Sequence, residues 1–267
     1  MSDPSRDPVQ RPPARSTPWC LLRAGWHTLR DQFGLGFGWL AGLVRLAAFA
    51  GEYRRFRRLN VGTPFDMRGR DVLPCLSDRT ATTPVEPVYF LQDAWFARRI
   101  AEQRPVSHVD VGSSARSMAL VAQFVPVTLV DIRPVEIELE RFSFRAGSVL
   151  ALPYADRAVS SLSSLCVIEH IGLGRYGDPV DARGSEKAAA ELLRVLAPGG
   201  DLYVSVPVDA ECRIYFNAHR AFTRDYLLGL FPGLTLTAER YIYGRAYAPA
   251  YSPGQGFGTG LYHLRRP

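Results

Sequence analysis

The run Ser-His-Val-Asp-Val-Gly at residues 107–112 decides how the whole chain is interpreted. It is short and mostly apolar, which predicts a buried strand, and it ends on a glycine that allows a tight turn. A helix at 115–124 and a second apolar strand at 127–132, which carries Asp131 near its end, follow directly. A strand, a helix and a strand in this order are typical of a βαβ unit on a parallel sheet.

The same alternation continues to the C-terminus. Further strands are expected at 144–150, 159–167, 201–208, 234–243 and 259–264. Helices are expected at 89–102, 185–196 and 223–231. The last two strands have little helix between them, so they should pair antiparallel at the edge of the sheet. The predicted fold is α/β: an open, mostly parallel, Rossmann-like sheet of seven strands with an antiparallel C-terminal hairpin and an N-terminal helical extension.

Four segments of different composition are expected along the chain. Residues 1–18 are rich in proline and arginine and predict a disordered tail, and residues 19–58 predict an apolar helical extension. Residues 59–104 should form a connector and an N-terminal helix, and residues 105–267 the main domain.

The first half of the apolar extension invites a membrane interpretation. The tryptophans and arginines of residues 19–50 suit a helix that lies in a membrane surface, and a helix packed on the main domain is the alternative. A membrane-spanning helix fits less well, because Arg45 interrupts the apolar run.

Composition excludes several classes of protein. Of the 267 residues, 47% are hydrophobic and 22% are charged, which rules out a wholly disordered chain and, without a long apolar run, a protein with several membrane spans. The net charge is +6, but nearly all basic residues are arginines and only 54–58 is dense in them, so no nucleic-acid partner is expected. The scattered cysteines form no zinc or disulfide pattern and, with no signal peptide, predict a cytoplasmic protein, with the inner face of the membrane left open.

The ends of the first two strands predict a nucleoside site. In an open parallel sheet, ligands bind beyond the carboxyl ends of the strands. Gly112 would let the backbone approach a ligand there, and Asp131 could accept hydrogen bonds from both hydroxyls of a ribose. The loop after Gly112 lacks the further glycines that cradle a pyrophosphate, which argues against NAD and FAD. A ligand with a ribose and no pyrophosphate fits better.

Residues 105–208 resemble the class I S-adenosylmethionine-dependent methyltransferases. The segments that carry this resemblance are 108–112, 129–131, 147–156, 167–171 and 191–200. The strings EHIGLGRYGDP at 169–179, FNAHR at 216–220 and CLSDR at 75–79 resemble a narrower, methyltransferase-like bacterial and nematode group of unknown function. The resemblance implies a fold and a cofactor, S-adenosyl-L-methionine, and does not identify the methyl acceptor.

The resemblance also implies which residues hold the cofactor. They are Asp110, Gly112, Ser113, Asp131, Ile132, Ser148, Val149 and Glu169. The family usually has two further glycines where Ser114 and Arg116 stand, and an acid where Ser148 stands. A catalytically silent, methyltransferase-like binding module is therefore the alternative to an active enzyme.

Methyl transfer needs mainly an aligned nucleophile, and an oxygen or nitrogen nucleophile benefits from a general base. His170, after the fourth strand, and His219, after the fifth, are the predicted catalytic residues. The residues predicted to bind the acceptor are Arg175, Tyr176, Asn217 and Arg220. No metal site is predicted. The chain is thus predicted to be an S-adenosylmethionine-dependent methyltransferase that acts on a small-molecule or glycan acceptor.

Overall fold

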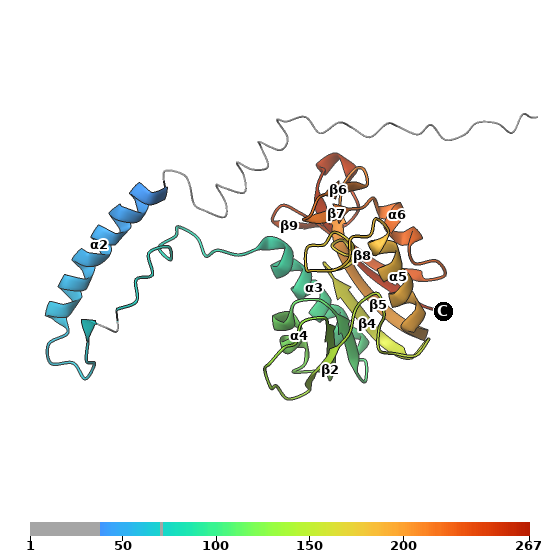
Figure 1. The fold of residues 1–267 in the computed structure, drawn as a ribbon, viewed down its shortest axis with the longest axis horizontal. Coiled ribbons are helices and arrows are strands. Elements are labelled where there is room, and N and C mark those ends of the chain that lie inside the picture. The colour runs from blue at the N-terminus through green and yellow to red at the C-terminus, as the bar shows by residue number, and fades with distance from the viewer. Residues whose placement is uncertain (1–37, 70–71) are drawn as a thin grey trace, which may run out of the picture. The chain divides into compact units, whose positions relative to one another are not determined.

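The computed structural model describes residues 38–69 and 72–267 (Figure 1). It divides the chain into two compact units, which meet in the sequence between Pro84 and Val85. The predicted tail at 1–18 and the first part of the apolar extension, 19–37, lie outside the described residues. In the first unit the described helix is α2 (Gly38–Leu59). No helix in the described ranges combines the length and the apolar character needed to cross a bilayer.

In the described residues, the second unit is built on a sheet of eight strands in the order β3-β2-β1-β4-β5-β10-β8-β9. Their bounds are β1 (His108–Val111), β2 (Val127–Asp131), β3 (Phe142–Ala146), β4 (Val159–Leu165), β5 (Leu196–Val208), β8 (Thr235–Tyr243), β9 (Ala246–Ala248) and β10 (Gly258–Arg265). The first five pair in parallel, whereas β10 runs antiparallel to both β5 and β8. The predicted open, mostly parallel fold is confirmed, with β9 added at one edge as an eighth strand.

Helices cover both faces of this sheet. Figure 1 shows α3 (Pro87–Gln103) and α4 (Ala115–Val121) on one side, and α5 (Gly184–Val195) and α6 (Arg224–Gly229) on the other. The helix α3 begins where the sequence favours it, because Pro87 occupies the first turn and the Glu86 carboxylate accepts a hydrogen bond from the Tyr89 N–H. The Thr223 hydroxyl caps α6 in the same way.

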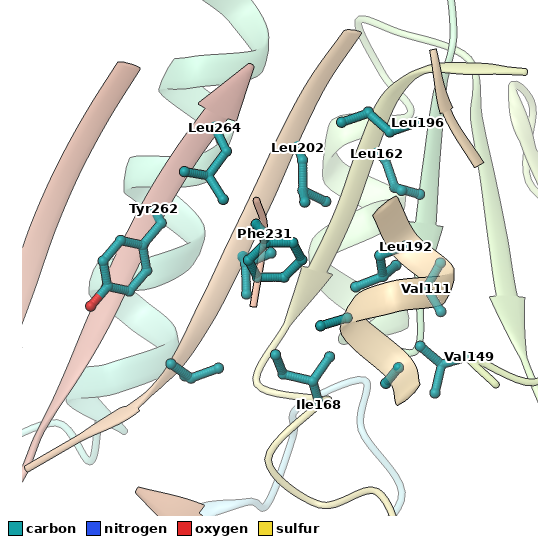
Figure 2. Packing of buried hydrophobic residues seen from close by; sticks show 14 of the residues in the cluster. Val111, Val149, Leu162, Ile168, Leu192, Leu196, Leu202, Phe231, Tyr262 and Leu264 are labelled. Atoms are coloured by element: carbon teal, nitrogen blue, oxygen red, sulfur yellow. The ribbon is translucent and has the colours of Figure 1, made fainter. Parts of the chain in front are cut away.

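The alternation of side chains along each strand divides the core into two clusters. On β5, Leu202 and Val204 belong to the cluster beneath α5 and α6, whereas Tyr203 belongs to the cluster beneath α3 and α4. Figure 2 shows the first cluster, where Leu192 of α5 and Phe231 lie against strand residues. Burial on both faces explains the mostly apolar run 202–208 of β5, whereas β4 carries four serines, three of which form hydrogen bonds inside the core.

Three differences from the predicted elements affect the site. The compact unit begins at Val85 and not at 105, because Trp95, Phe96 and Ile100 of α3 are buried in its core. The predicted strand at 144–150 begins and ends earlier, as β3, so Gly147 starts a loop. A short hairpin, β6 (Arg213–Tyr215) and β7 (His219–Ala221), stands between β5 and α6 and was not predicted.

Candidate functional site

A cavity of about 300 Å³ lies at the carboxyl ends of the parallel strands. This volume falls within the range of small-molecule sites, and the position is where an open parallel sheet binds its ligands. The residues that line it and were predicted from the sequence are Gly112, Asp131, Ile132, Ser148, Val149, His170 and Tyr176. The structure therefore brings together the ends of β1, β2 and β4 with two loops, 147–150 and 176–179.

Two glycines in the cavity wall are packed too closely to carry a side chain. Gly112 has φ +72°, and a Cβ there would lie 3.0 Å from Cγ1 of Val167. A Cβ at Gly147 would lie 2.8 Å from Cγ1 of Val130. Arg116, which replaces a glycine of the family pattern, is exposed and does not line the cavity. The altered loop therefore does not fill the space beside Gly112.

Asp131 stands at the end of β2 with its side chain mostly buried against the cavity wall. Its Oδ1 accepts a hydrogen bond from the Arg133 N–H at 2.8 Å, which fixes the orientation of the carboxylate. Among the hydrogen bonds of the described residues, none uses Oδ2 of Asp131. One carboxylate oxygen thus remains for a ligand, as binding of a ribose hydroxyl requires.

Asp110 and Ser113, both predicted to bind the cofactor, do not line the cavity but lie buried beside it. The Asp110 carboxylate accepts hydrogen bonds from the N–H and the hydroxyl of Ser113 and from the Ser163 hydroxyl. Burial raises the pKa of Asp110 to about 6, against the lowering effect of these bonds. The two residues hold the turn that follows β1, and so they position Gly112.

His170 lines the cavity as a neutral imidazole. Its Nδ1 lies 2.6 Å from the carbonyl oxygen of Ala218, and because a carbonyl only accepts, Nδ1 carries the proton. Burial lowers the pKa of His170 to about 4, helped by the nearby Arg175. At neutral pH its Nε2 therefore holds a lone pair that can accept a proton.

Glu169 is fully buried next to His170 and does not line the cavity. Burial raises the pKa of Glu169 to about 8. Its Oε1 lies 3.7 Å from Nε2 of His170, but both groups are neutral at pH 7, so the contact is not an ion pair. Its Oε2 has no hydrogen-bond partner within the described part of the chain.

The stability of the fold should depend on this carboxyl group. Glu169 stays protonated in the folded state up to about pH 8 but ionises near pH 4.5 when unfolded, so folding takes up a proton in between. His108, His170 and His219, whose pKa values are lowered by burial, act in the opposite direction, and because an unfolded histidine titrates near pH 6.5, part of that effect extends above pH 6.5. Between pH 6.5 and 8 we expect the contribution of Glu169 to the free energy of unfolding to fall by roughly 1.5–2 kcal/mol, at about 1.4 kcal/mol per pKa unit.

Urea unfolding at pH 6.5 and 8 measures this change. Glu169→Gln should remove it, because an amide does not titrate, whereas Glu138→Gln, at an exposed position, should retain it. An equal pH dependence in wild type and Glu169→Gln would contradict the assignment of a protonated buried acid.

The β6–β7 hairpin borders the site on the side of His170. His219 lies among aromatic rings, with its ring centroid 5.0 Å from that of Tyr215 and 5.4 Å from that of Phe257. Burial and the charge of Arg175 lower the pKa of His219. The Arg175 guanidinium donates to the carbonyl of Ala218, which ties the 172–179 loop to the hairpin. None of His219, Arg175 and the exposed Asn217 lines the cavity itself.

Tyr176 closes the cavity from the loop side. Its ring centroid lies 5.0 Å from Cζ of Arg133 and 5.2 Å from Cζ of Arg175. Arg133 and Cys166 also line the cavity, and sequence reasoning did not assign them to it. The place of Arg133, two residues after Asp131, could have indicated its role. Nothing in the sequence around Cys166 indicates the left-handed backbone, φ +54°, that it adopts.

Arg220 has a different place from the one predicted. It is buried, and its guanidinium donates to the carbonyl oxygens of Ile171, Asp181 and Ala182 and to the Ser185 hydroxyl. These acceptors bracket the loop that covers the cavity. Arg220 therefore fixes that loop and does not face the cavity.

Comparison with solved structures identifies the fold. The N-methyltransferase NodS from Bradyrhizobium japonicum WM9, in complex with S-adenosyl-L-homocysteine, is 18% identical, with a TM-score of 0.52 over 68% of this chain and 89% of that chain. A second structure of NodS is 18% identical, with a TM-score of 0.51 over 68% and 98%. The 1,6-didemethyltoxoflavin-N1-methyltransferase of Burkholderia thailandensis is 17% identical, with a TM-score of 0.46 over 70% and 93%. The two NodS structures show that the chain has a Rossmann-like methyltransferase fold.

Sequence comparison adds a family without a known function. The family model described as "Caenorhabditis protein of unknown function, DUF268" matches residues 128–241, which run from β2 to β8. The match covers less than half of the chain, and its description gives no support to the predicted bacterial relation. No curated protein matches the chain.

Proposed function

We propose that the chain is an S-adenosylmethionine-dependent methyltransferase that transfers a methyl group to a small-molecule or glycan acceptor. One observation carries the proposal: a single cavity at the strand ends brings Gly112, Asp131, Val149 and His170 together. One carboxylate oxygen is free to bind a ribose hydroxyl of a nucleoside. Two glycines, at which an added Cβ would meet neighbouring side chains, leave the backbone open to close approach by the amino-acid tail of such a ligand.

Each part of the cofactor has a candidate partner among these residues. Asp131 would accept hydrogen bonds from the ribose, and the backbone at Gly112 would leave room for the methionine part. Ile132 and Val149 offer apolar surface to the adenine. When bound, the cofactor would supply an electrophilic methyl group.

The remaining residues of the site would handle the acceptor. His170 would take the proton of the acceptor nucleophile at Nε2, while its Nδ1–H stays on the Ala218 carbonyl. With a pKa of about 4, His170 is a weaker base at neutral pH than one whose pKa matches that pH, so it would take the proton only from a nucleophile that becomes acidic as its new bond forms. Arg175 and Tyr176, with Asn217 and His219 on the hairpin side, would surround the acceptor.

Isothermal titration with S-adenosylhomocysteine tests the cofactor assignment. We expect wild type to bind it and Asp131→Ala to bind about 100-fold more weakly, because charged hydrogen bonds contribute about 1.5–3 kcal/mol each. Asp225→Ala removes a carboxylate that is 94% exposed and should bind as wild type does. A wild-type protein that binds NAD but not S-adenosylhomocysteine would overturn the proposal.

A silent binding module is the second candidate, and the replacement of family glycines by Ser114 and Arg116 favours it. The two differ in turnover. A silent module would bind S-adenosylhomocysteine. It would not convert S-adenosylmethionine to S-adenosylhomocysteine when any acceptor extract is added.

A further inference from the structure

The helix α2 (Gly38–Leu59) carries features that the proposed function does not use. We propose that α2 binds the surface of an anionic lipid bilayer, with its N-terminal part among the acyl chains and its C-terminal part at the phosphates. The inference is independent of the proposed function, because no residue of α2 belongs to the cavity.

The N-terminal part of α2 exposes large apolar side chains. Leu43 is 55% exposed, Val44 69% and Leu46 46%. At about 100° per residue, Leu43 and Leu46 lie about 60° apart on one side of the helix and Val44 about 100° further round, so the three side chains span an arc of about 160°. An apolar arc of this width fits contact with acyl chains, and Arg45 lies outside it.

The length of this part limits how deep it reaches. Residues 38–50 span about 20 Å at 1.5 Å per residue, less than the ~30 Å hydrocarbon core of a bilayer. The part therefore fits into one leaflet. Arg45 interrupts it, but a guanidinium on a long side chain can extend to the headgroups.

The C-terminal part of α2 is strongly basic. Arg54, Arg55, Arg57 and Arg58 are all exposed, together with Phe56 between them. No ion pair among the described residues uses any of these arginines, and the carboxylate of α2, Glu52, is paired with Arg79 at 2.7 Å.

A favourable interaction with the C-terminus of the helix accounts for only part of this cluster. That effect is confined to the last turn, which holds Arg57 and Arg58. Arg54 and Arg55 lie outside that turn, so the helix C-terminus does not account for them. Phosphate groups match guanidinium geometry, and only a lipid surface offers them directly beside a medium for the apolar part. A nucleic acid would leave Leu43 and Val44 in water.

Sedimentation of the full chain with lipid vesicles tests the proposal. We expect binding to vesicles of phosphatidylcholine mixed with phosphatidylglycerol, weakening as salt is raised, and little binding to phosphatidylcholine alone. Replacing Arg54, Arg55, Arg57 and Arg58 together by glutamine should weaken binding by about 1000-fold, at about 1 kcal/mol per arginine.

A matched variant separates the position of these charges from their number. Replacing Arg104, Arg157, Arg240 and Arg245, which are exposed in the second unit, by glutamine removes the same net charge and should leave vesicle binding within a few-fold of wild type. An equal loss in both variants would mean that net charge alone attracts the protein, and would overturn the proposal.

The apolar part needs its own variant. Leu43→Ser, Val44→Ser and Leu46→Ser together should weaken vesicle binding at high salt, where burial of apolar surface contributes most of the affinity. Binding of S-adenosylhomocysteine should stay unchanged in every α2 variant, which separates this proposal from that of the methyltransferase site. Unchanged vesicle binding in both α2 variants would contradict the role of the helix.

Discussion

Gly172→Ala should destabilise the second unit by roughly 3 kcal/mol or more, beyond the usual effect of a single substitution. Gly172 has φ +82°, and a Cβ there would lie 2.1 Å from the backbone oxygen of Asp181. No side-chain movement relieves a contact with backbone, so the loop would have to shift. The shift would break the hydrogen bond from the Asp181 N–H to the Gly172 carbonyl.

Gly177→Ala is a control in the same loop. Gly177 has nearly the same φ, +83°, but a Cβ there would meet nothing within 4 Å. It should therefore show only the cost of left-handed backbone, about 1–2 kcal/mol. Urea unfolding of both variants isolates the steric contribution as the difference between them. Equal losses of stability would show that the close approach to Asp181 does not exist in solution.

The part of the cavity around Gly112 and Asp131 could be predicted because it depends on local sequence. A buried apolar run fixes each strand, and a parallel sheet places the carboxyl ends of neighbouring strands at one edge. Gly112 and Asp131 end two such strands, β1 and β2, which are paired neighbours. The sequence pattern alone is therefore enough to predict that both residues line the same cavity.

The surroundings of the β6–β7 hairpin depend on tertiary placement, which the sequence does not reveal. The strands β6, β7 and β9 are three residues each, too short for a periodic pattern to indicate them. Because the β6–β7 hairpin was not predicted, the sequence did not indicate which way the side chains of residues 216–220 point. Asn217 lies exposed in the turn of that hairpin, whereas Arg220 lies buried in β7.

Arg220→Met should destabilise the fold by roughly 2–4 kcal/mol, because each buried acceptor left without a partner costs about 1–3 kcal/mol. The guanidinium serves four acceptors at once, at distances from 2.6 to 3.3 Å. Methionine would fill most of the volume and satisfy none of them. Arg220→Lys should recover only part of the loss, since an ammonium group cannot reproduce the planar fork of an arginine.

The exposed Arg240 provides the matched control, and Arg240→Met should change the free energy of unfolding by less than about 0.5 kcal/mol. The two roles considered for Arg220 give opposite results. A residue that fixes the loop lowers stability and also weakens S-adenosylhomocysteine binding, because Tyr176 and Asp178 of that loop line the cavity. A residue that binds the acceptor would leave both unchanged and reduce only turnover. If Arg220→Met were as stable as wild type, the result would instead support the role predicted from the sequence, in which Arg220 binds the acceptor.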